Sequence, residues 1–256
     1  DDIAHSLAGD DHEESATRAF EISEWCEAIP EIGRHAGVRT GLLHMMRHGT
    51  DDGKFWACYA VYSIGCSSTA SKFVLGLTVS VYEALQMLIE KGQKRVRLAA
   101  CMALAMLSEV FSGSSAAEAF AMTGCMLGTL VGAMTINAAP GEWDADAEEL
   151  RDCAAVVLHN ASNVPRVAGL IVETAGMIDT LKDLCLGPEC RVWRRGPRGA
   201  VLSKGSVNAF CILNNLARHP RTRATLRETG VLGGLAELVL PGQGPPPYTL
   251  APNLDP

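Results

Sequence analysis

The chain is poor in aromatic residues and in basic charge. Aromatic residues make up 5% of its 256 residues, whereas hydrophobic residues make up 48%. A core built from this sequence is therefore aliphatic, and the length suffices for one large domain or two small ones. Lys and Arg number 22 against 29 Asp and Glu, which gives a net charge of −7. This balance disfavours a general nucleic-acid surface or a surface for anionic membranes.

The sequence also has no CxxC pair and no long apolar run. Its nine cysteines lie mostly within apolar segments, which predicts reduced core thiols, no zinc site, and an intracellular, reducing compartment such as the cytoplasm or nucleus. The longest apolar run, Phe73 to Ile89, is short for a membrane span and contains Glu83, so we expect no membrane insertion. Because the chain begins with Asp1, we expect a fragment or a processed form, and an organelle stays open.

An internal repeat organises the chain. Five segments share a plan: a small residue comes first, a Leu stands five places on, and two core-type residues close the segment. Such a recurrence over tens of residues is typical of stacked helical units. The shared leucines are Leu42, Leu85, Leu130, Leu181 and Leu235, at spacings of 43, 45, 51 and 54 residues.

A second segment alternates with the first, as "YAVYSIG", "MALAMLS", "VVLHNAS" and "CILNNLA". Its alignment places Ser63, Met106, Asn160 and Asn215 in one position, here called the register position. The shared Leu precedes this position by 21 residues in the first two repeats, and by 30 and 34 in the next two. The repeat is therefore regular except for insertions of 9 and 13 residues at the same internal place.

Both segments have the three-to-four spacing of helix faces. A third, shorter helical pattern precedes each small residue. Pro165 and Pro220 suit the first turn of this short helix, and Gly176 and Gly230 suit its end. Three helices in a unit of about 40 residues cannot bury their apolar faces alone, so the units must stack into a solenoid.

The segments "GVLGGLAELV" and "CILNNLA" resemble armadillo repeats, in which Gly-apolar and Leu-x-x-Leu-Leu precede Ala-Leu-x-Asn-Leu-Ala. The resemblance covers roughly Pro30 to Leu240, and His12 to Ile29 looks like the last helix of a truncated repeat. It implies an all-α, right-handed superhelix of about four repeats with partial caps at each end. We expect an acidic segment at 1–11, one armadillo domain at 12–242 and a Pro-rich tail at 243–256. The repeats fall roughly at 30–66, 67–110, 111–162, 163–217 and, incomplete, 218–242.

The resemblance further implies a non-enzymatic scaffold or adaptor that binds an extended peptide or a partner protein along the concave face of the third helices. Asn160 and Asn215 match the family's Asn, which hydrogen-bonds the backbone of a bound peptide. Val156 and Cys211 stand where importin-α-like members have Trp, so a Trp-lined groove for nuclear signals is not expected. The alternative interpretation of both Asn residues is that they brace adjacent helices.

The two insertions lie between the second and third helices of their units, and therefore on one edge. The second insertion carries a cluster of cations and one Trp, residue types that dominate interface hot spots and bind carboxylates. We expect it to contact an acidic segment of a partner; a solvated loop is the alternative. The residues concerned are Arg191, Trp193, Arg194, Arg195 and Arg198.

Two short motifs suggest other functions. Arg47, His48 and Gly49, followed by Thr50, match the opening of a histidine-phosphatase site. A helix end explains them better, because the cations precede Gly49 as a helix cap and no second catalytic His is indicated. Pro245 to Tyr248 fits the PPxY pattern of WW-domain ligands, although incidental prolines in a linker give the same pattern. No nucleophile–base set and no phosphate-binding loop occurs, and no cofactor is expected. A permanent subunit of a larger assembly is the alternative function.

Overall fold

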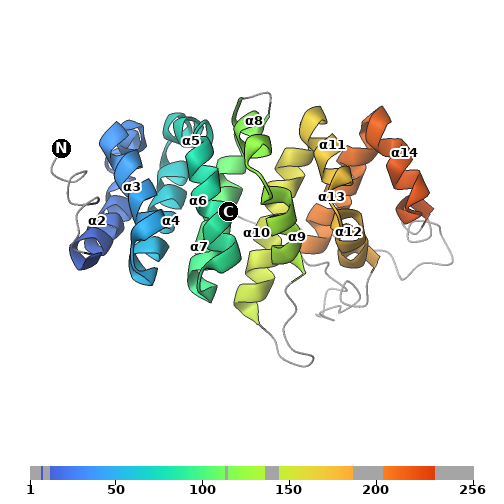
Figure 1. Ribbon diagram of the computed structural model, residues 1–256. Coiled ribbons are helices and arrows are strands. Elements are labelled where there is room, and N and C mark those ends of the chain that lie inside the picture. Colours follow the sequence, from blue (N-terminus) through green and yellow to red (C-terminus); the bar gives the residue numbers. More distant parts are fainter. Residues whose placement is uncertain (1–6, 8–11, 113–114, 136–143, 187–203, 234–256) are drawn as a thin grey trace, which may run out of the picture.

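A computed structural model describes residue 7 and residues 12–112, 115–135, 144–186 and 204–233. All regular elements in these ranges are helices. The first helix with described bounds is α2 (His12–Trp25), which is followed by four three-helix units and the start of a fifth. Figure 1 shows these units side by side, with α2 at one end and α14 at the other.

Each unit has a short first helix, a second helix and a longer third helix. The first helices are η1 (Pro30–Arg34), α5 (Thr69–Gly76), α8 (Ser115–Met122), α11 (Pro165–Glu173) and α14 (Pro220–Glu228). The second helices are α3 (Ala36–His48), α6 (Val79–Lys91), α9 (Met126–Met134) and α12 (Met177–Leu186). The third helices are α4 (Asp51–Ser67), α7 (Lys94–Ser108), α10 (Ala145–Ser162) and α13 (Lys204–Arg218).

The starts and ends of the short helices are set by the backbone properties of Pro and Gly. Pro165 and Pro220 occupy the first turns of α11 and α14, where the missing N–H has no partner to lose. Gly176 and Gly230 have φ values of 74° and 70°, a left-handed conformation that side-chain-bearing residues rarely adopt. These two glycines therefore turn the chain from the first helix into the second.

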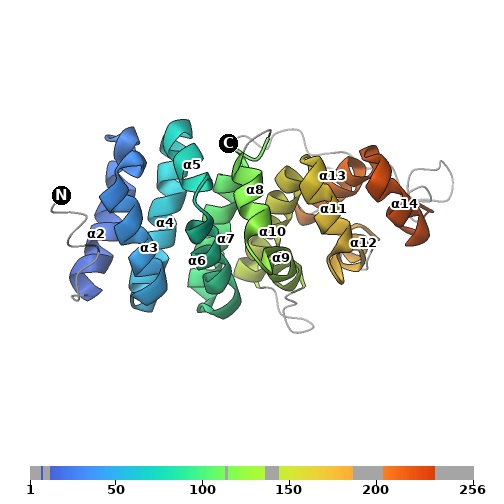
Figure 2. The same ribbon diagram turned by 45° about the horizontal axis from the view of Figure 1, so that its top comes forward.

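The core is continuous and aliphatic. The repeated Leu42, Leu85, Leu130 and Leu181 are at most 1% exposed and share one hydrophobic cluster with residues from every unit. The third helices pack against one another in one row, α2–α4–α7–α10–α13, and Figures 1 and 2 show this row from two angles. Because the third helices run through the stack without a break, their outward residues form one face.

Among the described residues, no single helix has the length and apolar character to cross a membrane. Two pairs of consecutive helices, α5–α6 and α8–α9, have the required length and apolar character only when the two helices are taken together. The helices within these pairs are bent by 82° and 81°.

Candidate partner-binding face

The outward residues of the third helices form a surface with a repeating layout, here called the third-helix face. Positions −8, −4 and −1, counted from the register position, are half-buried or exposed in all four units. Position −8 holds Phe55, Leu98, Asp152 and Val207; position −4 holds Tyr59, Met102, Val156 and Cys211; position −1 holds Tyr62, Ala105, His159 and Asn214. The resemblance to armadillo repeats assigns these rows to the concave face.

The two predicted Asn residues link neighbouring third helices. Asn160 Nδ2 donates to Ser108 Oγ at 2.8 Å, and Asn215 Nδ2 donates to Ser162 Oγ at 3.0 Å. Ser108 and Ser162 are fully buried, and both close the preceding third helix. These bonds match the bracing interpretation of the Asn residues, and a contact with a bound peptide stays a prediction.

The brace follows a fixed rule along the chain. In each case, the residue at the register position meets the residue two places beyond the register position of the preceding unit. The earlier pair obeys the same rule, because Met106 lies over Gly65, where an added Cβ would come within 2.5 Å of Met106 Cγ. An apolar side chain thus faces Gly, whereas an amide faces Ser, so each pair is matched in size and polarity.

Five aromatic side chains gather on α2 and α4, and they are called the aromatic patch: Phe20, Phe55, Trp56, Tyr59 and Tyr62. The ring centroids of Phe20 and Trp56 are 4.7 Å apart, edge to face. Phe55 and Tyr59 stack at 6.2 Å, and Tyr59 and Tyr62 follow at 5.9 Å. Phe20 is 40% exposed, and the other four are half-buried. Such partly exposed rings can cover apolar ligand surface at small entropic cost.

The aromatic patch was not among the sites predicted from the sequence, although the sequence contains a signal for it. The whole chain has only six Phe, four Trp and four Tyr. Phe55, Tyr59 and Tyr62 nevertheless stand at helical spacing in "FWACYAVY". A scarce residue type at i, i+4 and i+7 of one helix predicts an aromatic stripe, but its contact with Phe20 needs the stacking of α2 on α4.

Two ion pairs lie near the two ends of α7, beside the aliphatic rows next to the patch. Arg95 forms an ion pair with Asp52, and its guanidinium carbon lies 5.4 Å from the centroid of the Phe55 ring. Lys72, 8% exposed, pairs with Glu109 near the other end of α7. The rows between these pairs carry uncharged side chains in α4 and α7. Between these pairs, the three rows of α4 and α7 therefore offer uncharged side chains to a ligand.

Tyr62, at the edge of the patch, lies beside Cys66. Burial, followed by a hydrogen bond to Cys66, raises the pKa of Tyr62 to about 12. The phenol therefore remains neutral at physiological pH and supplies a polar group beside the rings.

The other half of the face, on α10 and α13, mixes apolar side chains with Asp152, His159 and Asn214, and it is called the polar half. Asp152 accepts a hydrogen bond from the backbone N–H of Gly205, which links these two helices. Burial is the largest influence and raises the pKa of Asp152 to about 6. The hydrogen bond from Gly205 lowers this pKa, and the negative charge of Glu148 raises it. A partly buried carboxyl at position −8 thus stands where α4 has Phe55.

The insertions begin and end on one edge of the stack. The first connects α9 to α10 and the second connects α12 to α13, and Figure 1 shows these helix ends along the same side. Asp144 caps α10 by accepting from the N–H groups of Asp146 and Ala147, and it pairs with Lys94 at 2.8 Å. The acidic run after the first insertion therefore starts a helix.

The predicted cationic cluster lies outside the described residues: Arg191, Trp193, Arg194, Arg195 and Arg198. Pro245 to Tyr248 also lies outside them, so both predictions stay predictions.

The phosphatase-like motif stands at the exposed end of α3. Arg47 pairs with Glu83 of α6 at 3.4 Å, and the rings of His44 and His48 are 4.9 Å apart. Gly49 follows as the cap, and its N–H donates to Met45 O. In a phosphatase site, the Arg47 guanidinium would have to bind phosphate, but here it forms an ion pair with the Glu83 carboxylate. The end of helix α3 therefore explains the motif.

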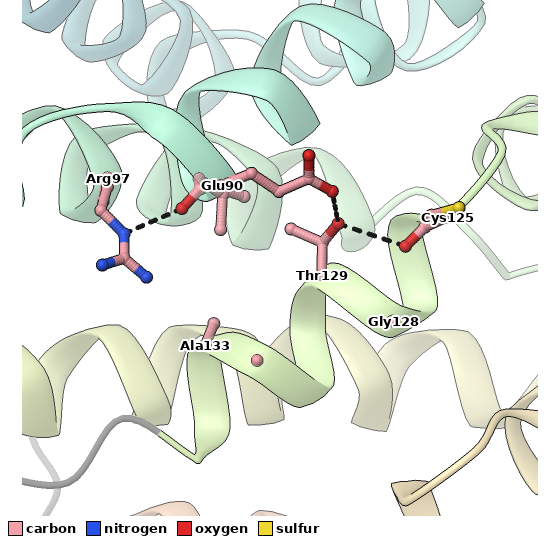
Figure 3. A pocket seen from close by; sticks show the side chains of 8 residues that line it. Glu90, Arg97, Cys125, Gly128, Thr129 and Ala133 are labelled. Atoms are coloured by element: carbon pink, nitrogen blue, oxygen red, sulfur yellow. Dashed lines mark hydrogen bonds between the residues drawn. The ribbon is translucent and has the colours of Figure 1, made fainter.

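A shallow pocket of about 320 Å³ lies between α6, α7 and α9 (Figure 3). Arg97 Nε donates to Ile89 O at 2.8 Å, and Thr129 Oγ1 donates to the Glu90 carboxylate. Hydrogen bonds from Gln86 and then Thr129 lower the pKa of Glu90. Within the pocket, Thr129 and Glu90 are thus bonded to each other, and Arg97 Nε is bonded to a backbone carbonyl. Within the described ranges, no group of three or more His, Cys, Asp or Glu is placed to hold a metal ion.

No family model and no curated protein matches the chain. Solved structures do match. A computationally designed armadillo repeat protein for modular peptide recognition has a TM-score of 0.72 and 16% identity, covering 93% of this chain and 90% of its own. A designed armadillo repeat protein in complex with the peptide (KR)4 gives 0.72 and 16%, covering 94% and 92%. Uso1-1 gives 0.70 and 14%, covering 93% of this chain and 39% of its own.

These likenesses define the class of the protein as an α-solenoid. Its particular fold is armadillo-like, and the predicted all-α, right-handed armadillo-type superhelix is confirmed.

Proposed function

We propose that the protein is a non-enzymatic scaffold or adaptor that binds a partner protein or an extended peptide through its third-helix face. The observation that carries the proposal is the aromatic patch. Five of the chain's 14 Phe, Trp and Tyr residues gather there, partly exposed, on two neighbouring helices. Aromatic side chains in such a position supply most of the binding energy of many interfaces. The peptide-bound designed protein of the same fold supports this use of the fold.

The test begins with a pull-down by the intact chain, read by mass spectrometry, and continues with the affinity of the partner found. Tyr59→Ala should weaken binding by at least about tenfold, because it removes the central ring of the patch. Phe73→Ala is the matched control: Phe73 is 41% exposed but lies on α5. Equal effects of the two changes would contradict a role of the patch.

The cationic insertion is proposed as a second contact, with an acidic segment of the partner. Arg194→Glu with Arg195→Glu should weaken binding and reduce its salt dependence while leaving the melting temperature unchanged. An unchanged affinity and salt response would leave the third-helix face as the whole binding surface.

A permanent subunit is the second candidate, and exposed apolar residues at one end of the stack favour it. Trp25 is 37% exposed and Ile29 is 50% exposed, on and just after α2. Aggregation of the isolated chain, relieved by Trp25→Gln with Ile29→Gln, would support this candidate. A monodisperse monomer would favour transient binding.

The proposal includes an intracellular, reducing compartment. The eight described cysteines are all free thiols, the state that such a compartment maintains.

A further inference from the structure

We infer that a second copy of the chain occupies the two ends of the stack: α2 of one copy docks against the outer side of α13 of another, and copies join head to tail. The surfaces are the ends of the stack and not the third-helix face, so the inference goes beyond the proposed function and does not rest on it. Figure 1 shows α2 at one end and α13 with α14 at the other.

Each third helix has one side that faces the next third helix along the row, here called its outer side. The residue two places beyond the register position lies on this side, because Ser108 and Ser162 accept hydrogen bonds from the Asn residues of the next unit. The residue five places before the register position lies there as well, because Cys101 Sγ donates to Leu150 O of α10 at 3.7 Å. These two positions therefore report how well the outer side is covered.

The outer side of α13 is less well covered than the outer sides of the other third helices. In α4, α7 and α10, both positions are buried in every case. In α13 they hold Phe210 and Ala217, which are only half-buried. A further helix at this place would remove apolar surface of Phe210 from water, which is favourable.

The helix α2 has the complementary deficit. Within the described ranges, α4, α7 and α10 each pack between two third helices, whereas α2 packs against α4 alone and α13 against α10 alone. One side of α2 carries the buried Ser15, Ala19 and Ile22. Thr17 and Glu24 lie on the opposite side of the helix and are exposed. Docking α2 on α13 of another copy gives both helices a second neighbour in the row.

The two ends carry opposite charge. With His neutral, residues 12–34 contain six Glu and two Arg and have a net charge of −4, whereas residues 204–233 contain five Lys and Arg and one Glu and have a net charge of +4. Glu24, Glu27, Arg218 and Arg227 are exposed, and their side chains make no ion pair with other described residues. Electrostatic attraction therefore favours contact between unlike ends and opposes contact between like ends.

The opposite charges lie at the same level of the stack. The Asn–Ser bonds join residues near the C-terminal ends of neighbouring third helices, so these helices run in one direction. The helix α2 shares this direction, because Cys26, just after α2, bonds to Ser67 at the end of α4. Glu24 lies at the C-terminal end of α2 and Glu27 just beyond it, while Arg218 ends α13. A second copy that continues the row therefore brings these Glu residues to the Arg218 end of α13.

Two further arginines extend the cationic surface onto α14. Arg223 Nε donates to Ala217 O at 2.8 Å, so its guanidinium lies against the C-terminal end of α13. Arg227 follows one turn later on the same side of α14. At the α2 end, Trp25 is 37% exposed, and a guanidinium can stack on its ring while it pairs with a neighbouring carboxylate. The two surfaces thus match in charge and in the type of contact.

Sedimentation velocity of the full chain tests the inference, because a head-to-tail joint leaves a free α2 and a free α13 on every open assembly and growth continues beyond the dimer. The weight-average mass should rise with protein concentration between about 10 µM and about 1 mM, a range suited to a small interface. Raising NaCl from about 0.05 M to about 0.5 M should weaken the association at least about tenfold, because exposed charges are screened. A monomer at every concentration, or an association insensitive to salt, overturns the inference.

A charge swap identifies the two surfaces. Glu24→Lys with Glu27→Lys should weaken self-association at least about tenfold, and so should Arg218→Glu with Arg227→Glu. An equal mixture of the two variants should associate again, because the unchanged α13 end of the first meets the unchanged α2 end of the second. Recovery in the mixture also demonstrates that both variants are folded.

Glu173→Lys with Asp179→Lys is the matched control. Both acids are exposed and lie on α11 and α12, and the change of net charge equals that of the α2 variant. Self-association should persist in this control and in Tyr59→Ala, which alters only the third-helix face. Loss of association in Tyr59→Ala would overturn the inference and place the contact on that face.

Two results of the charge swap would also overturn the head-to-tail joint. Full association of either end variant alone would indicate contact between like ends. A mixture that does not recover, although both variants keep the circular-dichroism spectrum of the parent, would show that the two ends do not meet each other.

Discussion

The two halves of the third-helix face share one backbone plan and differ in chemistry. On α4 and α7 the exposed rows are aromatic or aliphatic, and the helices meet through Met106 over Gly65. On α10 and α13 the same rows include Asp152, and the helices meet through Asn215 and Ser162. The repeat therefore fixes where a side chain stands, while the residue type at that place decides whether it binds a ligand or a neighbour.

The largest effect is expected from removing the polar braces. Asn215→Ala should lower the free energy of unfolding by about 2 kcal/mol, because it leaves the buried Ser162 hydroxyl without its donor. Asn160→Ala should cost about 1 kcal/mol, since Asn160 is only half-buried. Urea titration measures both. A loss of partner affinity beyond the loss of stability would show that the amides also face the ligand.

A double-mutant cycle can move the polar brace into the apolar half. Gly65→Ser alone should cost about 1.5 kcal/mol, because the new Cβ meets Met106 Cγ. With Met106→Asn added, the pair recreates the Asn–Ser bond of the later units, and the coupling energy should reach about 1 kcal/mol. Additive losses in chemical denaturation would mean that the two halves differ in backbone spacing as well as in side chains.

Within the third-helix face, a pH-dependent effect on stability is expected from Asp152 in the polar half. The pKa of Asp152 lies near 6 in the folded protein, above its ordinary 3.8. The folded state therefore holds a proton that the unfolded chain has lost, and stability falls as pH rises from about 4 to about 6. Asp152→Asn should remove this slope and add about 1 kcal/mol at pH 7, a discounted figure because the carboxyl is partly solvated. Thermal melts across this pH range would refute the assignment if both proteins showed the same slope.

The smallest effect concerns a residue outside both halves. His48→Ala should change the free energy of unfolding by less than about 0.5 kcal/mol, since His48 is exposed at the end of α3. Any biochemical activity of the protein should persist. A phosphatase activity that disappears in this variant, with the fold intact, would reverse the interpretation of the motif.

The fold could be predicted from the sequence because the repeat recurs in register. The shared leucines, the Pro at the start of the short helices and the Gly after them each obey local rules that stacking does not change. The Asn–Ser braces were harder. The bracing role was one of two interpretations, but its Ser partner lies 52 or 53 residues away and depends on how neighbouring helices slide. Ring contacts between α2 and α4 depend on the same stacking.

The offset of the braces limits how the units can be exchanged or multiplied. Each Asn needs a Ser two places beyond the register position of the unit before it. Beyond Asn215 that place holds Ala217. A duplicated fourth unit inserted after the original would therefore present its amide to a methyl group. The contacts between units therefore depend on the order of the units. Adding a copy of the fourth unit requires the compensating change Ala217→Ser where the two copies meet.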